Sequence, residues 1–322
     1  MPEITARGVR FHVQTLNPPR PASGRDGVAV ERSGAGGGGA SAGGASAGGP
    51  VVVFVHGLAL DNLSSFYYRL AGPVAAAGAR AVLYDQRGHG LSERTPSGYG
   101  PADAVADLFA VLDELDVVQP VHLVSNSFGG VLALNAALAR PERVAGLALI
   151  ESYGPADDEL LWNEALLNTL GKSALVLEYE NLAAQFGAIG WRQRARQTAT
   201  ADRLINGTTL VADVAAAEPV RPAALAALTC PVLAVYGEHS DLLDAGRLLE
   251  THVPDCELHV LPGHAHTVLS DGTDDLLAVL LPWLSRPATT PASRARAREQ
   301  APAVDPGSRP GAREPSCAGG AR

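Results

Sequence analysis

The chain has 322 residues, 46% of them hydrophobic, and a formal net charge of −9 at pH 7. This length and apolar content are enough for one large α/β domain with a buried core. The negative charge argues against a general nucleic-acid or anionic-membrane surface, so we expect neither as a partner. No apolar stretch reaches the ~18 residues of a membrane span, and no signal-peptide pattern opens the chain. The three cysteines lack metal or redox spacing, which fits a reducing cytoplasm as the location.

Residues 1–17 are predicted to form the opening strand or hairpin of the core. Residues 18–50 follow, and their second half is almost entirely Gly, Ala and Ser. Such a segment cannot bury enough apolar surface to order itself, so we predict a disordered insertion. The end of the chain, residues 286–322, is rich in Pro, Ala, Arg and Ser and is predicted to be a disordered tail.

Continuous apolar runs recur along the middle of the chain, and they predict strands that are buried on both faces. These runs are Val51–Val55, Ala81–Tyr84, Val121–Val124, Leu147–Ile150 and Pro231–Tyr236. The apolar spacing of residues 101–116 indicates an amphipathic helix between two of the strands. Residues 155–222 break this alternation of strand and helix.

The third of these runs leads into Ser125-Asn126-Ser127-Phe128-Gly129-Gly130, and a helix-forming segment follows. A sharp strand–turn–helix connection exposes a nucleophilic serine, and it needs small residues two positions away on each side. Ser125 occupies the place where this pattern usually has its first glycine, so the motif is a variant, S-x-S-x-G. We predict that Ser127 is a nucleophile; the alternative is an ordinary turn with a serine cap.

Four motifs together resemble the α/β-hydrolase family. They are His56-Gly57-Leu58 after one strand, YDQRGHGLS at residues 84–92, the serine turn, and LPGHAH at residues 261–266. The resemblance covers about residues 51 to 285 and keeps the family's order. It implies an α/β fold with a mostly parallel central sheet and helices on both faces. Residues 51–154 and 223–285 would form this core, and residues 155–222 would form a small helical cap.

The resemblance also implies a serine–histidine–acid triad. The family pattern places the base at His266, which would take the proton from Ser127; His264, two residues earlier, is the alternative. A His-x-His pair can also be a fragment of a metal site. No third ligand stands at a recognisable spacing, so we expect no metal.

For the acid, the family pattern points to Asp241, in the loop after the run Pro231–Tyr236. Glu238, Asp244 and Glu151 are alternatives. Glu151 follows the strand Leu147–Ile150, at a position that some family members use for the acid. It can also be read as a strand-end carboxylate that is solvated or paired.

The family holds the oxyanion with two backbone N–H groups, which correspond here to those of Leu58 and Phe128. Removing one such donor typically costs about 2.7–4 kcal/mol of barrier. We interpret His56 as structural. The same interpretation covers Asp85, Arg87 and His89, because a turn rich in Gly and charge needs internal hydrogen bonds.

The function that we expect is a cofactor-free serine hydrolase with a small-molecule acyl substrate. It would cleave an ester or thioester of a small to medium apolar acyl group through an acyl-enzyme on Ser127. Alternatives on the same scaffold are a polyketide-type tailoring or release enzyme, a C–C hydrolase and a cofactor-free perhydrolase. A non-catalytic ligand-binding protein is the alternative of another class. Trp162 and Trp191 are either packed inside the cap or line the acyl pocket, and the oligomeric state is left open.

Overall fold

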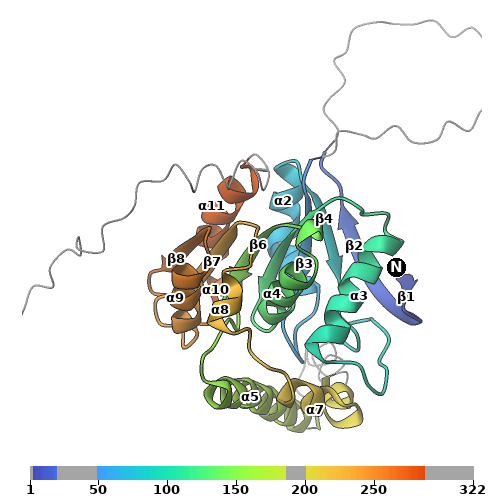
Figure 1. Cartoon of the computed structure of the whole chain (residues 1–322). Helices are drawn as coiled ribbons and strands as arrows, with labels where there is room; N and C mark the ends of the chain where they lie inside the picture. Colours follow the sequence, from blue (N-terminus) through green and yellow to red (C-terminus); the bar gives the residue numbers. More distant parts are fainter. Residues whose placement is uncertain (1–2, 20–48, 186–200, 287–322) are drawn as a thin grey trace, which may run out of the picture. The chain divides into compact units, whose positions relative to one another are not determined.

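The computed structural model describes residues 3–19, 49–185 and 201–286, with residues 176–185 described by their backbone (Figure 1). The predicted tail at 286–322 lies beyond the described residues except for Arg286. The predicted insertion at 18–50 also lies outside them except for its first and last two residues. Trp191 is not among the described residues either.

An eight-stranded sheet forms the centre of the described chain. Its order is β1 (Glu3–Ala6), β2 (Val9–Leu16), β4 (Arg80–Tyr84), β3 (Val51–Val55), β5 (Val121–Asn126), β6 (Val144–Ile150), β7 (Val232–Gly237) and β8 (Cys256–Leu261). β1 and β2 form an antiparallel hairpin, β2 pairs antiparallel with β4, and every later pair is parallel. The mostly parallel sheet of the expected fold class is therefore confirmed.

Helices cover both faces of the sheet. One core cluster contains side chains of α3 (Pro101–Glu114), α4 (Gly129–Ala139), α8 (Pro222–Leu225) and α9 (Leu243–His252). The other contains side chains of α1 (Ser64–Phe66), η1 (Tyr67–Ala71), α2 (Gly72–Ala76), α10 (Val268–Asp271) and α11 (Thr273–Leu284). Within β3, Val51 and Val53 face the first cluster, whereas Val52 and Phe54 face the second. This two-sided burial explains why the parallel strands read as continuous apolar runs.

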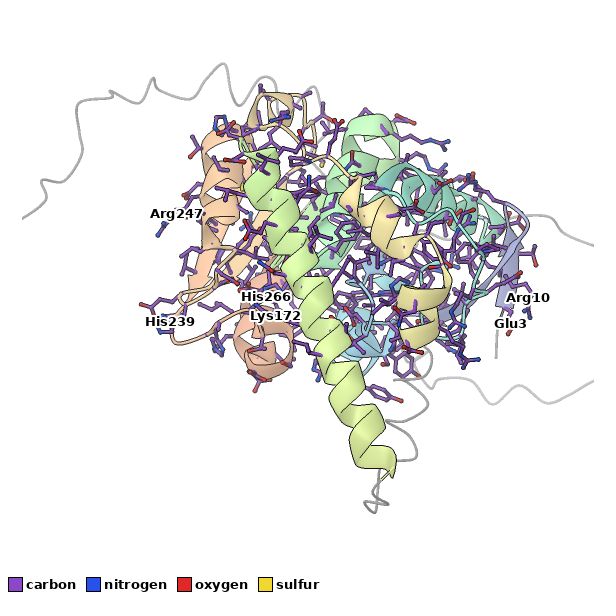
Figure 2. The ribbon with its side chains drawn as sticks, turned by 90° about the horizontal axis from the view of Figure 1, so that it is seen from below. Glu3, Arg10, Lys172, His239, Arg247 and His266 are labelled. Carbon is purple, nitrogen blue, oxygen red and sulfur yellow. The ribbon has the colours of Figure 1, made fainter. Side chains whose placement is uncertain are left out.

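Residues 155–222 are the region predicted to form a cap, and the name is kept for them here. Their described part contains α5 (Glu159–Gln185) and α7 (Leu210–Ala215), and residues 201–207 are also helical. Figure 2 shows α5 lying across the molecule when it is seen from below Figure 1. Trp162 of α5 is 6% exposed, packs in one cluster with Phe128 and Leu210, and donates from Nε1 to the Gly154 carbonyl at 3.2 Å. This burial supports the packing interpretation of Trp162. No helix of the described ranges is long and apolar enough to cross a membrane.

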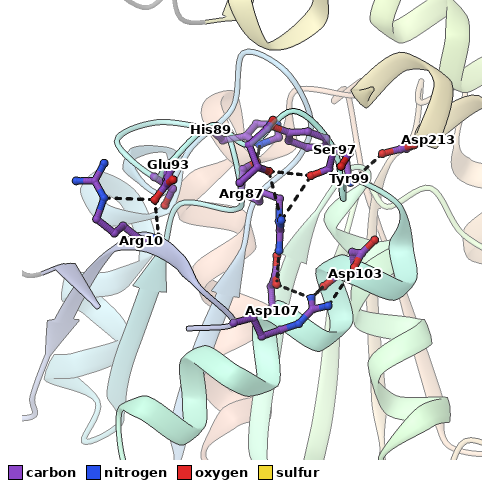
Figure 3. A network of polar contacts seen from close by, with 12 residues as sticks. Arg10, Arg87, His89, Glu93, Ser97, Tyr99, Asp103, Asp107 and Asp213 are labelled. Carbon is purple, nitrogen blue, oxygen red and sulfur yellow. Dashed lines mark hydrogen bonds and ion pairs between the residues drawn. The ribbon is translucent and has the colours of Figure 1, made fainter. Parts of the chain in front are cut away.

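A charged network joins the β1–β2 turn, α3 and the loop after β4 (Figure 3). Asp107 of α3 accepts from Arg87 Nε and Nη2 at 2.8 and 2.9 Å, and from Arg7 Nη1 at 2.6 Å. The Asp107 and Arg87 side chains are only 3% and 13% exposed. A bidentate pair of this kind fixes both the separation and the relative orientation of the elements that carry it.

Replacing Asp107 by alanine is therefore expected to destabilise the fold by about 3 kcal/mol, because the largely buried Arg87 guanidinium loses its bidentate partner. Asp113→Ala on the same helix is the matched control. Its ion pair with Arg143 involves a side chain that is 56% exposed, so we expect a loss of no more than about 1 kcal/mol. Urea unfolding of both variants measures the difference, and equal losses would contradict the structural role of Asp107.

Candidate active site

Ser127 occupies a strained turn between β5 and α4. Its φ is +54°, in the left-handed region, and its side chain is partly exposed. The Ser127 N–H donates to the Ile150 carbonyl at 3.1 Å, and its carbonyl accepts from Gly130 and Tyr153 at 3.0 and 3.1 Å. A left-handed conformation costs a residue with a Cβ about 1–2 kcal/mol. Such residues concentrate at functional sites, where the surrounding bonds hold them in place.

The residues that flank Ser127 explain the variant motif. A Cβ on Gly129 would come within 2.3 Å of the Val55 carbonyl oxygen, so only glycine allows α4 to begin this close to β3. Ser125, on the other side, is fully buried, and its hydroxyl donates to the Ala148 carbonyl at 3.4 Å. Its small side chain fits inside the sheet, where a substrate has no access to it.

His266 follows β8 and has a carboxylate partner. Its Nδ1 lies 3.1 Å from Oε2 of Glu151, the residue directly after β6. The Glu151 side chain is 0% exposed. Its two oxygens also accept from the Gly237 N–H and the Ser240 hydroxyl, so the carboxylate connects the ends of β6, β7 and β8. Glu151 has a φ of +46°, so it adopts a left-handed conformation, as Ser127 does.

This geometry differs from the expectation for Asp241. The Asp241 side chain is exposed, and no hydrogen bond joins it to His266 among the described residues. The reason is the course of the loop after β7. Ser240 turns toward Glu151 and donates to it, which leaves the next residue facing solvent. The sequence signal for Glu151 was its position directly after a buried strand, where an ionised group needs a partner.

Glu238, Asp244 and His264 each have a partner away from His266. Glu238 accepts from the Gly263 N–H at 3.0 Å, and Asp244 pairs with Arg247 at 2.9 Å on the surface. His264 lies 3.3 Å from Asp275 of α11 and does not contact Glu151. The structure therefore singles out His266 as the histidine beside the buried carboxylate.

Two backbone donors near Ser127 lack an acceptor within the described part of the chain: the N–H groups of Leu58 and Phe128. Leu58 follows β3, and Phe128 follows Ser127 at the start of α4. β3 and β5 are neighbours, and the chain continues from them to opposite sides of the sheet, through β4 and β6. Ligands of parallel sheets bind at such a switch point, outside the carboxyl ends of the strands.

Tyr153 connects this region to the cap. Its N–H donates to the Ser127 carbonyl, and its ring lies edge-on to the His266 ring with a centroid distance of 6.4 Å. Its hydroxyl donates to the Ala165 carbonyl of α5 at 3.2 Å and also contacts Thr169. Figure 2 shows His266 close to α5 in projection.

Comparison with known proteins agrees with this architecture. The putative carbamate hydrolase RutD of Variovorax paradoxus is 36% identical over 95 residues, which are 29% of this chain and 35% of that protein. Several curated relatives are matched over only about a third of their length. The 2-hydroxy-6-oxononadienedioate/2-hydroxy-6-oxononatrienedioate hydrolase of Cupriavidus pinatubonensis is 27% identical over 232 residues, 67% of this chain and 80% of that protein.

Among solved structures, the esterase from Exiguobacterium antarcticum superimposes with a TM-score of 0.63 at 16% identity, and covers 88% of this chain and 99% of the esterase. At this identity the likeness shows the fold alone. Residues 52–279 match the model of the Alpha/beta hydrolase family, which is most of the chain. The chain belongs to the alpha/beta hydrolase family.

Proposed function

We infer that the protein is a serine hydrolase that cleaves an ester or thioester of a small to medium apolar acyl group. The observation that carries this proposal is the hydrogen bond between His266 and the buried Glu151, at the same end of the sheet as the strained Ser127 turn. A histidine oriented by a buried carboxylate is the base that a serine nucleophile requires.

Acylation begins when Ser127 Oγ attacks the carbonyl carbon and His266 Nε2 accepts the hydroxyl proton. His266 Nδ1–H donates to Glu151, which fixes the tautomer and stabilises the imidazolium that forms. The carbonyl oxygen becomes an oxyanion and accepts hydrogen bonds from the Leu58 and Phe128 N–H groups. Because the helix α4 begins beside Phe128, the positive end of its dipole adds to this stabilisation.

The second half of the reaction releases the acid. His266 returns its proton to the leaving alcohol or thiol as the tetrahedral carbon collapses to the acyl-enzyme. It then takes a proton from a water molecule, which attacks the acyl carbon and displaces Ser127 Oγ. Ser127 regains its proton from His266, so the cycle closes without a cofactor.

The surroundings support a neutral, apolar acyl group. A cavity of about 20 Å³ is lined by Leu58 and Phe128 together with Tyr99 and Leu210; it has room for about one water molecule, so an acyl chain must lie outside it. Arg87 is the one arginine among the described residues that line the cavity, and the Asp107 carboxylate neutralises its charge through two hydrogen bonds. The apolar cluster of Phe128, the cap and their neighbours excludes water from the same region, which protects an acyl-enzyme.

A second candidate is hydrolysis of a C–C bond in a hydroxy-oxo dienoate. The relative from Cupriavidus pinatubonensis supports it, since 80% of that protein is matched. The substrate in its name is a dicarboxylate, and among the described residues that line the cavity the one arginine, Arg87, is already paired with Asp107. Turnover of p-nitrophenyl esters of two to eight carbons, compared with turnover of such a dienoate, separates the two candidates.

Ser127→Ala is expected to abolish labelling by a fluorophosphonate probe and to lower kcat by about 10⁶-fold, since the nucleophile is lost. Ser125→Ala is the matched control, because that hydroxyl is buried under the turn. It should keep labelling and most of the activity. If only Ser125→Ala lost labelling, the nucleophile would be Ser125 and the assignment of Ser127 would be wrong. A wild-type chain that is never labelled would favour a ligand-binding protein.

Glu151→Gln is expected to lower kcat by about 10⁴-fold with little change in KM, because the amide cannot stabilise an imidazolium. Asp241→Asn should retain nearly full activity, since this side chain lies in solvent. Steady-state kinetics of both variants, measured well below their melting temperatures, provides the comparison. A large loss confined to Asp241→Asn would return the acid role to Asp241.

A further inference from the structure

In the loop after β3, backbone N–H groups that donate to side chains stand on both sides of one that does not. The Gly57 N–H donates to Asp61 Oδ2 at 2.7 Å, and the Ala59 N–H donates to His89 Nε2 at 3.0 Å. The Leu58 N–H stands between them and has no acceptor among the described residues. Both neighbours of the oxyanion donor are thus bound by side chains, and the donor itself is left free.

The hydrogen bonds of His89 define its tautomer. Its Nδ1 lies 2.9 Å from the Arg87 carbonyl, so Nδ1 carries the proton and Nε2 is the acceptor for Ala59. Figure 3 shows His89 directly beside Arg87. The ring is buried, and this burial, with His56 nearby, lowers the pKa of His89 to about 4. The acceptor nitrogen is therefore free of a proton at neutral pH.

Ala59 shows why the loop needs such support. Its φ is +59°, a left-handed conformation that alanine seldom adopts. A strained residue persists only where the surrounding structure over-determines it. Here the bond to His89 fixes the Ala59 amide, and a further bond from the Asp61 N–H to the Leu58 carbonyl, at 3.2 Å, closes the turn.

Asp61 places the same loop against the nucleophile. Besides Gly57, its carboxylate accepts from the Asn62 N–H at 2.9 Å and from the Ser65 hydroxyl. A Cβ built on Gly57 would lie 3.2 Å from Asp61 Oδ2 and also 3.2 Å from the Cβ of Ser127. The loop therefore lies in contact with Ser127, and any shift of its backbone changes the position of the Leu58 N–H relative to the reacting serine.

We propose that His89 and Asp61 are positioning residues for the oxyanion hole: each binds the N–H of one neighbour of Leu58, and together they direct the Leu58 N–H at the developing oxyanion. This inference rests on the proposed function. It gives His89 and Asp61 an effect on the transition state, which a structural role in folding alone would not produce.

The test uses the full chain and p-nitrophenyl butyrate as the substrate, with a trifluoromethyl ketone as the inhibitor. The ketone forms a hemiketal with Ser127 whose oxygen is an oxyanion, so its affinity reports on the oxyanion hole. His89→Leu is expected to lower kcat by about 10²–10³-fold with KM little changed. It should also lower the binding affinity of the ketone by a similar factor. His89→Gln, whose side-chain oxygen can accept from Ala59, should recover at least about tenfold of that loss.

His12→Gln is the matched control. His12 is buried, and its Nδ1 lies 2.8 Å from Asp85 Oδ2, but it makes no bond to residues 57–61. Asp85 itself contacts the loop after β3 at the Leu63 N–H, beyond the turn that holds Leu58. This variant should lose stability without losing ketone affinity when it is assayed below its melting temperature. If His89→Leu does not fold, the test uses Asp61→Ala, since the Asp61 side chain is only half-buried; the expected loss in kcat is about 10–100-fold.

A folded His89→Leu or Asp61→Ala chain that keeps wild-type kcat and ketone affinity would overturn the inference. So would parallel losses in His89→Leu and His12→Gln. Labelling of Ser127 by the fluorophosphonate in the unchanged chain distinguishes failure of the proposed function from failure of this inference. If that labelling fails, the proposed function falls and the inference falls with it; if only the variants behave unexpectedly, the proposed function stands.

Discussion

The buried carboxylate of Glu151 is the constraint on which the rest of the site depends. An ionised group without solvent contact is tolerated only where hydrogen bonds surround it. Glu151 obtains them from the Gly237 N–H at the end of β7, the Ser240 hydroxyl and His266 after β8. The chain must therefore bring three strand ends and their loops to one point before the side chain can be accommodated. The same convergence sets the orientation of the His266 ring.

The sheet supplies the frame for this convergence. Because β3, β5, β6, β7 and β8 run parallel, their carboxyl ends lie along one edge, and each contributes one part of the site. Ser127 and Glu151 adopt left-handed conformations directly after adjacent strands, at φ values of +54° and +46°. Each of these two side chains leaves the sheet at the first residue after its strand, so both are positioned by strands that are themselves buried on two faces. The charged network of Arg7, Arg87 and Asp107 fixes the hairpin and α3 at the other side of the sheet.

The parts of this arrangement that could be predicted from sequence are those encoded locally. The run before Ser127 and the glycines after it indicate a strand, a turn and a helix within a dozen residues. The fold class followed from the resemblance of this motif and three others to the α/β-hydrolase family. The acid was expected at Asp241, with Glu151 as an alternative, whereas the carboxylate that bonds to His266 in the structure is that of Glu151. Sequence could not decide between them, because the choice depends on how two loops distant in sequence meet. Glu151 and Asp241 each follow an apolar strand, and only the path of the loop through Ser240 separates a buried carboxylate from an exposed one. The bond of His89 to the loop after β3 was out of reach for the same reason, since His89 lies 30 residues from Ala59.

The position of Tyr153 has a consequence for how a substrate reaches the site. Its hydroxyl is bonded to α5 through Ala165 and Thr169, while its own N–H is bonded to the Ser127 carbonyl. Burial raises the pKa of the Tyr153 phenol, so the hydroxyl remains a donor. The first turns of α5 thus cannot rise from the sheet without breaking these bonds or pulling on the backbone beside the nucleophile. A substrate that enters without displacing Tyr153 leaves the geometry of Ser127 intact, and the same holds for a product that leaves. Access to the site then does not require the first turns of α5 to move.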